Sequence, residues 1–327
     1  MTEERFLVTG ASGCIGAWVV RNLARQNVPS AGLSLSGSLQ RLQLIMSTDE
    51  MAQVRFIKGD IADLDTLVRA VEEFEATHVI HLAALQLPFC KADPALGARV
   101  NVVGTVNVFE AARRAGLRQV VYASSAAVYG PSEEYPAGPL AHDAPLKPRS
   151  HYGVYKQANE GSARTYWLEE GISSIGLRPY VVYGAGRDQG MTSTPTTAML
   201  AAAAGRPYRI SYGGRFCFQY ADDVAKVFIA AARSPFEGAD VFNIGGDSIS
   251  VPEIIQAIEL AEPTMRGQIS YADVPLPFPA RMDNSALRQV LGPLCSSLLA
   301  DGVAETMAIF RHALAEGLIS QSSGGVQ

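Results

Sequence analysis

The chain begins with an apolar segment that leads directly into a glycine-rich turn. Residues 6–9, Phe-Leu-Val-Thr, are typical of a buried strand, and glycines follow at positions 10, 13 and 16. Gly10 permits a tight turn, Gly13 lets the backbone approach a pyrophosphate, and Gly16 lets the following helix pack closely on a sheet. A plain strand-to-helix turn is the competing interpretation. The position between a strand and a helix favours a dinucleotide site.

Strand-like and helix-like segments alternate through the first half of the chain. Strands are predicted at residues 6–9, 30–35, 54–58, 78–82, 119–123 and 174–178, and helices at 15–25, 100–115 and from 152 onward. This alternation predicts an α/β fold of the Rossmann type, a doubly wound parallel sheet with helices on both faces.

A smaller lobe is expected beside this sheet. We predict that residues 1–180, with about 218–250, form the dinucleotide-binding core. Residues from about 181 to 217 and from 251 to 327 are less regular and contain segments rich in Pro and Gly. They are expected to form a mostly C-terminal lobe that binds the substrate.

Composition excludes several classes of function. The 327 residues carry a formal net charge of -5, and the Lys and Arg residues are scattered, so no nucleic-acid partner is expected. The apolar run Ala198–Ala204 is too short to cross a bilayer, and we predict a cytoplasmic protein without a membrane partner. Cysteines 14, 90, 217 and 295 form no CxxC pair and the histidines form no HExxH, so no metal site is predicted.

Tyr152 and Lys156 are the candidate catalytic pair. They are one helical turn apart, so their side chains share a helix face. A free phenol has a pKa of about 10, and a neighbouring ammonium favours the phenolate, so Lys156 is expected to lower the pKa of Tyr152. Ser125, in the loop after the fifth predicted strand, is positioned to hydrogen-bond the reacting oxygen. A surface helix with Tyr and Lys at a common spacing is the alternative.

Other residues at the ends of predicted strands are candidates for cofactor contacts. Asp60 and Ile61 could meet an adenine ring, although Asp60 could equally cap a helix. A carboxylate usually receives the ribose hydroxyls of NAD at the end of the second strand, and this chain has Ser34 there. Arg41 is the nearest cation that could meet a 2′-phosphate. We predict NAD as the cofactor, with NADP as the alternative.

The chain resembles the extended short-chain dehydrogenase/reductases, the NAD-dependent epimerase/dehydratase group. The resemblance covers most of residues 5–260 and rests on motifs that occur in order: VTGASGCIG at 8–16, GDI at 59–61, HLAA at 81–84, NVVGT at 101–105, SSAAVYG at 124–130, YGVYK at 152–156, LRP at 177–179, VYG at 182–184, YADDVA at 220–225 and NIG at 243–245. It implies a Rossmann core with bound NAD(P), and a homodimer formed through helices near 101–115 and 152–170.

The predicted site follows from these motifs. The catalytic residues are Ser125, Tyr152 and Lys156. The predicted cofactor-binding residues are Gly10, Ser12, Gly13, Cys14, Ile15, Gly16, Ser34, Arg41, Asp60, Ile61, Leu82, Ala83, Ala84, Tyr152, Lys156, Pro179 and Tyr180. The predicted substrate-binding residues are Gln86, Ser125, Ala126, Tyr152, Arg187 and Arg215.

Departures from the family pattern narrow the predicted function. Nucleotide-sugar 4,6-dehydratases of this group carry an acidic pair after the catalytic Ser or Thr, where this chain has Ala126 and Ala127. Val181 replaces a frequent Asn that binds a diphosphate, and Gln86 replaces a frequent Lys. We therefore expect an NAD(P)-dependent oxidoreductase that oxidises a secondary alcohol of a sugar or sugar-derived substrate, as an epimerase or a dehydrogenase. The alternative is a dinucleotide-sensing binding protein without catalysis.

Overall fold

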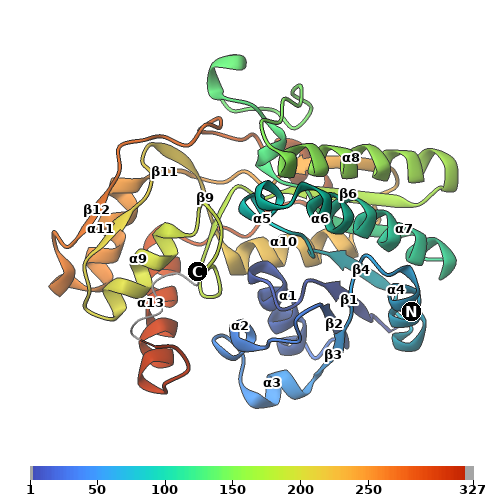
Figure 1. Ribbon diagram of the computed structural model, residues 1–327, viewed down its shortest axis with the longest axis horizontal. Coiled ribbons are helices and arrows are strands. Elements are labelled where there is room, and N and C mark those ends of the chain that lie inside the picture. The colour runs from blue at the N-terminus through green and yellow to red at the C-terminus, as the bar shows by residue number, and fades with distance from the viewer. Residues whose placement is uncertain (1–2, 321–327) are drawn as a thin grey trace.

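The computed structural model describes residues 3–320 and contains a seven-stranded parallel sheet with helices on both faces (Figure 1). The strand order is β10-β6-β5-β4-β1-β2-β3. The strands are β1 (Phe6–Thr9), β2 (Ser30–Ser34), β3 (Val54–Lys58), β4 (His78–His81), β5 (Gln119–Ala123), β6 (Ser173–Arg178) and β10 (Ala239–Asn243). The predicted doubly wound sheet is confirmed.

Apolar strands form the centre of the sheet because both of its faces are covered. All residues of β1 are buried, and successive side chains point to opposite faces. Phe6 and Val8 join one hydrophobic cluster, whereas Leu7 joins the other. The sheet therefore separates two hydrophobic layers, each packed against its own set of helices.

The helices divide between these two layers. On one face, α1 (Cys14–Arg25) packs against α10 (Ala221–Arg233). On the other face, α7 (Gly104–Arg114) contacts both α4 (Leu64–Phe74) and α8 (His151–Glu170). The short helices are α2 (Gln40–Gln43), α3 (Thr48–Ala52), α5 (Leu87–Ala92) and α6 (Pro94–Ala98).

The smaller sheets and the later helices lie to one side of the large sheet (Figure 1). A three-stranded sheet contains β7 (Val181–Tyr183), β9 (Arg215–Tyr220) and β11 (Ser248–Ser250), and a two-stranded sheet pairs β8 (Tyr208–Ile210) with β12 (Ile269–Tyr271). The helices here are α9 (Thr194–Ala203), α11 (Val251–Ala261), α12 (Ser285–Leu291) and α13 (Leu299–Ala315). The domain boundaries given above stay a prediction, and their terminal residues 1–2 and 321–327 lie outside the described part.

The helix predicted over residues 100–115 begins differently in the structure. A π-helical turn, Arg99–Val103, precedes α7. Within this turn, the Asn101 amide donates to the Leu85 carbonyl at 2.9 Å, and the Leu85 N–H donates to Asn101 Oδ1 at 2.7 Å. This reciprocal pair holds the segment after β4 against the turn. Sequence periodicity gives no sign of such an insertion in the helix.

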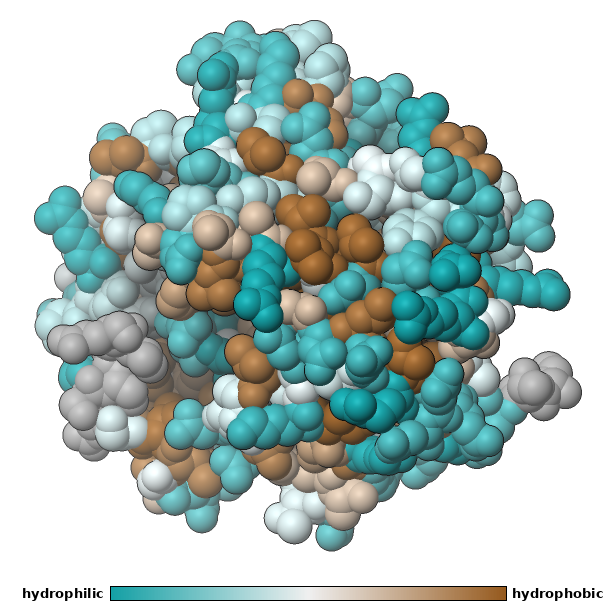
Figure 2. All heavy atoms as spheres, turned by 45° about the vertical axis from the view of Figure 1, so that its right-hand side comes forward, coloured by the Kyte–Doolittle hydropathy of each residue, from teal (hydrophilic) through white to brown (hydrophobic). Residues whose placement is uncertain are grey.

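Hydrophobic side chains are exposed on the helical face that contains α5, α6 and α8. Phe89, Leu96, Val103 and Val154 are each almost half exposed. Figure 2 shows hydrophobic residues gathered near the middle of one face, among hydrophilic neighbours.

Among the described residues, no helix combines the length and hydrophobicity that a membrane span requires. The cytoplasmic location stays a prediction.

We expect Gly16→Ala to destabilise the fold. A Cβ at this position would overlap the Gly10 carbonyl oxygen, which belongs to the backbone and has little freedom to move. Overpacking of this kind costs about 1–3 kcal/mol. Urea unfolding measures the loss. Glu72→Ala is the control, because Glu72 is exposed on α4 and alanine is a strong helix former, and we expect it to be nearly neutral. Equal unfolding free energies for the two variants would contradict this packing argument.

Candidate active site

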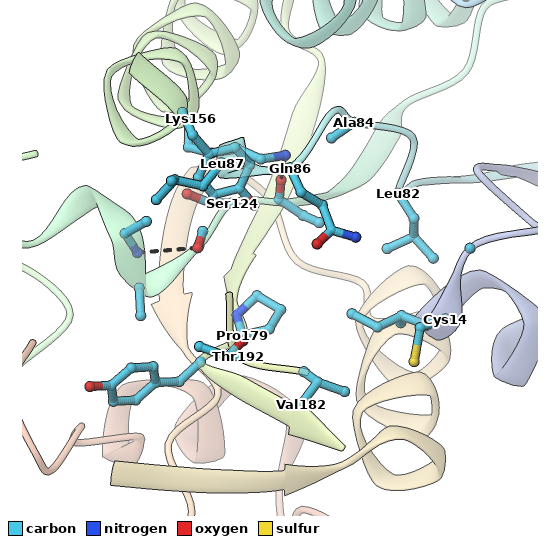
Figure 3. Close-up of a pocket in the computed structure, with 18 of the residues that line it drawn as sticks. Cys14, Leu82, Ala84, Gln86, Leu87, Ser124, Lys156, Pro179, Val182 and Thr192 are labelled. Carbon is cyan, nitrogen blue, oxygen red and sulfur yellow. Dashed lines mark hydrogen bonds between the residues drawn. The ribbon is translucent and has the colours of Figure 1, made fainter. Parts of the chain in front are cut away.

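A cavity of about 230 Å³ lies where the strands of the large sheet end (Figure 3). The segments that follow β1, β4, β5 and β6 at their carboxyl ends all contribute to its wall. This edge of a doubly wound sheet is where such folds bind ligands. The lining residues are Gly10, Gly13, Cys14, Ile15, Gly16, Leu82, Ala84, Gln86, Leu87, Pro88, Ala123, Ser124, Ser125, Ala126, Ala127, Tyr152, Lys156, Pro179, Tyr180, Val182, Arg187, Met191, Thr192 and Phe278.

The glycine-rich turn forms one end of this cavity. Gly10 has a φ of 72° and donates to the Leu33 carbonyl at 2.7 Å, which ties the turn to β2. A Cβ on Gly10 would overlap the backbone of Ala83, so only glycine allows β1 and the segment after β4 to approach this closely. Gly13 is the N-cap of α1, whose first N–H groups are suited to bind phosphate. These residues fit a dinucleotide.

The predicted cofactor-binding residues divide into two groups. Those that line the cavity are Gly10, Gly13, Cys14, Ile15, Gly16, Leu82, Ala84, Tyr152, Lys156, Pro179 and Tyr180. Those outside its wall are Ser12, Ser34, Arg41, Asp60, Ile61 and Ala83. Ser34, at the end of β2, pairs in register with Lys58 of β3. Sequence reasoning missed Lys58 as a cation near the expected ribose position, because only the strand register places it there.

Two of the outer residues have partners that the sequence did not predict. The Asp60 carboxylate accepts from the Ala62 N–H at 2.9 Å, whereas the N-cap of α4 is Asp63. The helix-cap alternative for Asp60 is therefore wrong. Arg41 pairs with Asp188, with a shortest N···O distance of 2.8 Å, and donates to the Ser12 carbonyl at 3.1 Å. Its charge is thus already compensated by a carboxylate.

Ser125 and Tyr152 are hydrogen-bonded to each other in the wall of the cavity. Ser150 caps α8 by accepting from the Gly153 N–H at 3.1 Å, so Tyr152 lies in the first turn of the helix. A Cβ on Gly153 would overlap the Ala127 carbonyl oxygen, and its absence lets α8 approach the segment after β5. A hydrogen bond from Ser125 counteracts the rise in the pKa of Tyr152.

Lys156 is buried beside this pair. Its ammonium donates to the Ala123 carbonyl at 2.7 Å and lies 5.8 Å from the centre of the Tyr152 ring. Desolvation lowers the pKa of Lys156 to about 8, although the Cys90 and Glu160 charges act in the opposite direction.

Lys156 is not among the groups that lower the pKa of Tyr152 in this structure, so its predicted effect on the phenol stays a prediction. Burial raises the pKa of Tyr152, and the influences that lower it are the Ser125 hydrogen bond and the charge of Arg187. The physical reason is that Lys156 directs its ammonium to a backbone carbonyl and not to the phenol oxygen. Desolvation of the phenol then outweighs the favourable charges.

Of the predicted substrate-binding residues, all but Arg215 line the cavity. Gln86, Ser125, Ala126, Tyr152 and Arg187 line the cavity, and Arg187 Nη1 lies 3.4 Å from Gln86 Oε1. Arg215 lies elsewhere: it is half exposed and pairs with Glu253 at 2.8 Å.

Further lining residues were not predicted. Leu87 and Pro88 begin α5, and Met191, Thr192 and Phe278 come from segments that the sequence marks only as rich in Pro and Gly. No motif in the sequence singles them out. Among the described residues, no group of His, Cys, Asp or Glu side chains is arranged to hold a metal ion.

The family model of the NAD dependent epimerase/dehydratase family matches residues 6–245. The chain belongs to this family. A UDP-glucose 4-epimerase of Mycolicibacterium smegmatis is 34% identical over 322 residues, which cover 94% of this chain and 99% of the relative. The predicted family, the Rossmann-type fold and NAD as the cofactor of the family are thus confirmed.

Solved structures of two related activities are similar over their full length. The UDP-glucose 4-epimerase of Thermus thermophilus in complex with NAD has a TM-score of 0.78 and 26% identity, covering 95% of this chain and 100% of the other. A partial consensus L-threonine 3-dehydrogenase has a TM-score of 0.81 and 25% identity, covering 94% and 99%. The same scaffold is thus present in an epimerase and in a dehydrogenase.

We expect the stability contribution of Lys156 to depend on pH. Its folded-state pKa of about 8 lies below the ordinary value of 10.5, so the folded protein binds fewer protons than the unfolded chain between these values. The free energy of unfolding of the wild type should therefore rise with pH across this window, relative to Lys156→Met, by at most about 3 kcal/mol. Urea unfolding from pH 7 to pH 10 measures this. Lys91→Met, which removes an exposed ammonium, is the control. If the difference in unfolding free energy between wild type and Lys156→Met stays constant from pH 7 to pH 10, the lowered pKa of Lys156 is contradicted.

Proposed function

We propose that the protein is an NAD-dependent sugar epimerase. The observation that carries this proposal is the convergence of Ser125, Tyr152 and Lys156 in a cavity whose other end is the glycine-rich turn. One cavity can thus hold a nicotinamide beside a secondary alcohol. The UDP-glucose 4-epimerase of Mycolicibacterium smegmatis, which this chain matches nearly end to end, supports epimerisation over net oxidation.

The cavity residues divide the proposed reaction among them. When bound, NAD supplies a hydride acceptor for the oxidation and a hydride donor for the return step. Tyr152 takes the proton of the substrate hydroxyl as the C–H hydride departs. It returns this proton to the same oxygen after the keto sugar has rotated to present its other face. Ser125 hydrogen-bonds that oxygen. The Ser125 hydrogen bond and the charge of Arg187 lower the pKa of Tyr152 and so oppose the rise that burial causes.

Dehydration is disfavoured by the chemistry of the cavity wall. Removal of water from a sugar needs an acid and a base beside the leaving hydroxyl. Ala126 and Ala127 follow Ser125, and none of the described lining residues is Asp, Glu or His. The proposed epimerisation needs only the single proton carrier Tyr152.

Arg187 and Gln86 are proposed to bind an anionic group of the substrate. The described lining residues include no other cation than Arg187 and Lys156. The Nη2 group of Arg187 donates to Thr192 at 3.0 Å, and its buried Nε has no hydrogen-bond partner. No carboxylate of the described residues forms an ion pair with the Arg187 guanidinium, since the neighbouring Asp188 pairs with Arg41. A partly buried guanidinium with neutral neighbours is suited to an oxyanion ligand.

A homodimer through α7 and α8 is part of the proposal. The family resemblance implies these helices, and Val103, Val154 and Leu168 expose apolar side chains on or beside them. Such a dimer contact would lie on the opposite side of α8 from the buried Lys156. We therefore propose that the partner subunit adds no residue to the cavity.

We expect Tyr152→Phe to lose most of its turnover and retain NAD binding. Loss of the proton carrier should reduce kcat by about 10²–10⁴-fold. Interconversion of UDP-glucose and UDP-galactose, with NAD binding measured by calorimetry, provides the test. Tyr155→Phe is the matched control, because the Tyr155 hydroxyl donates to the Pro94 carbonyl outside the cavity. Full turnover by Tyr152→Phe would favour a different base, and a wild type that binds NAD without turning over sugars would favour the dinucleotide-sensing alternative.

Arg187→Gln should raise KM for a substrate with an anionic group more than for a neutral analogue. Removal of a charge-assisted bond costs about 1.5–3 kcal/mol, which corresponds to roughly 10–150-fold in KM. Steady-state kinetics with UDP-sugars and the corresponding free sugars measure this. Arg215→Gln, which changes a guanidinium outside the cavity, is the control and should leave KM unaltered. Weaker NAD binding with an unchanged KM would instead assign Arg187 to the cofactor.

A further inference from the structure

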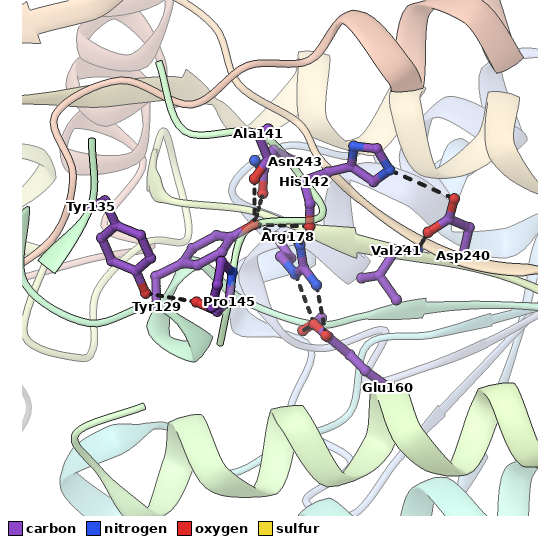
Figure 4. Close-up of polar contacts among 11 residues, drawn as sticks. Tyr129, Tyr135, Ala141, His142, Pro145, Glu160, Arg178, Asp240, Val241 and Asn243 are labelled. Carbon is purple, nitrogen blue, oxygen red and sulfur yellow. Dashed lines mark hydrogen bonds and ion pairs between the residues drawn. The ribbon is translucent and has the colours of Figure 1, made fainter. Parts of the chain in front are cut away.

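A buried ion pair joins Glu160 of α8 to Arg178 of β6 (Figure 4). Glu160 is one helical turn after Lys156 on α8, and Arg178 is the last residue of β6. Their side chains are 7% and 5% exposed. Arg178 donates from Nε to Glu160 Oε1 at 2.8 Å and from Nη2 to Oε2 at 2.7 Å, the bidentate geometry of a strong pair.

Ser124 connects this pair to the catalytic loop. Its hydroxyl donates to Glu160 Oε1 at 2.5 Å. Ser124 directly precedes Ser125 and follows Ala123, whose carbonyl accepts the Lys156 ammonium. The Glu160 carboxylate thus holds α8, the end of β5 and the end of β6 at one point.

The other side of Arg178 is also fully bonded. Its Nη1 group donates to the Tyr129 hydroxyl at 2.6 Å and to the His142 carbonyl at 2.5 Å. The Tyr129 hydroxyl donates in turn to Asn243 Oδ1 at 2.8 Å. Figure 4 shows how these groups converge on Arg178. Each guanidinium nitrogen of Arg178 and both carboxylate oxygens of Glu160 therefore have at least one hydrogen-bond partner, as a buried ion pair requires.

Stability alone does not account for such a network. A buried ion pair is often no more stabilising than apolar side chains of similar volume, but it imposes a defined geometry. Catalysis is sensitive to that geometry, because a displacement of about 1 Å can cost about 100-fold in rate. The network is located where a displacement would separate Tyr152 on α8 from Ser125 after β5.

We propose that Glu160 is a positioning residue that, with Ser124 and Arg178, fixes α8 against the ends of β5 and β6 so that Ser125, Tyr152 and Lys156 meet. The inference rests on the proposed function for its kinetic readout only. Two ionisable groups raise the pKa of Lys156 through their charge: Cys90 on α5 and Glu160 on the same helix as Lys156. The charge of Lys156 in turn lowers the pKa of His81 on β4.

Ser124→Ala tests the proposal without breaking the ion pair. We expect kcat to fall about 10–100-fold, while KM and the Kd of NAD change less than twofold and the protein stays folded. Ser124→Thr restores a hydroxyl and should recover most of kcat. The matched control is Ser174→Ala, which removes a fully buried hydroxyl from β6 that has no hydrogen-bond partner. A kcat of Ser124→Ala equal to that of Ser174→Ala, or no rescue by Ser124→Thr, would overturn the proposal.

A second measurement is independent of the substrate. The lysines are at positions 58, 91, 147, 156 and 226, so ¹³Cε-labelled lysine gives a simple NMR spectrum in which Lys156 can be titrated. In the wild type we expect a midpoint near 8. Ser124→Ala should raise this midpoint, because the released loop lets water reach the ammonium. Glu160→Gln should lower it, since a neighbouring negative charge is removed.

These measurements separate the two proposals. If no sugar is turned over by the wild type but the Lys156 midpoint moves as expected, the proposed function fails and the positioning network stands. If sugars are turned over and the midpoint and kcat of Ser124→Ala match those of the wild type, the network fails and the function stands. Ser124→Ala carries the test even where Glu160→Gln does not fold.

Discussion

The candidate active site depends on the close approach of backbone segments at glycine positions. Gly16 lets α1 pack against the Gly10 carbonyl, and Gly10 lets the turn contact the backbone of Ala83. Gly153 does the same for α8, which rests on the Ala127 carbonyl. A single methyl group at any of these positions would separate the dinucleotide turn, or the catalytic helix, from its neighbour. The distance between the glycine-rich turn and the Tyr152 phenol is therefore set by backbone packing.

Burial controls the electrostatics of the same site. Desolvation lowers the pKa of Lys156 and raises the pKa of Tyr152, so both groups are held closer to neutrality than in water. The nearby charges modulate this effect without reversing it. A cavity wall composed mainly of small and apolar residues thus has a chemical role, because it makes the few polar groups in it sensitive to each other.

Local sequence patterns predicted the parallel sheet well. The ranges 6–9, 54–58 and 119–123 match β1, β3 and β5. For β1 and β5 the reason is that continuous apolar runs between turns are characteristic of strands buried on both faces. Boundaries that depend on side-chain bonds were less accurate. Asp63, and not Asp60, caps α4, and the bonds between Asn101 and Leu85 accompany a π-helical turn that periodicity does not reveal.

The sequence alone determined the family, the glycine-rich turn and the catalytic candidates, since each depends on residues that are neighbours along the chain. Tertiary structure decided which distant residues share the cavity. Arg187 reaches Gln86 although 101 positions separate them, whereas Arg215 pairs with Glu253 outside it. Arg41 is neutralised by Asp188, and Ser124 and Arg178 meet at Glu160 of α8. The physical reason is that a charge acquires its function from the groups it contacts, and in this fold those groups come from different strands and helices.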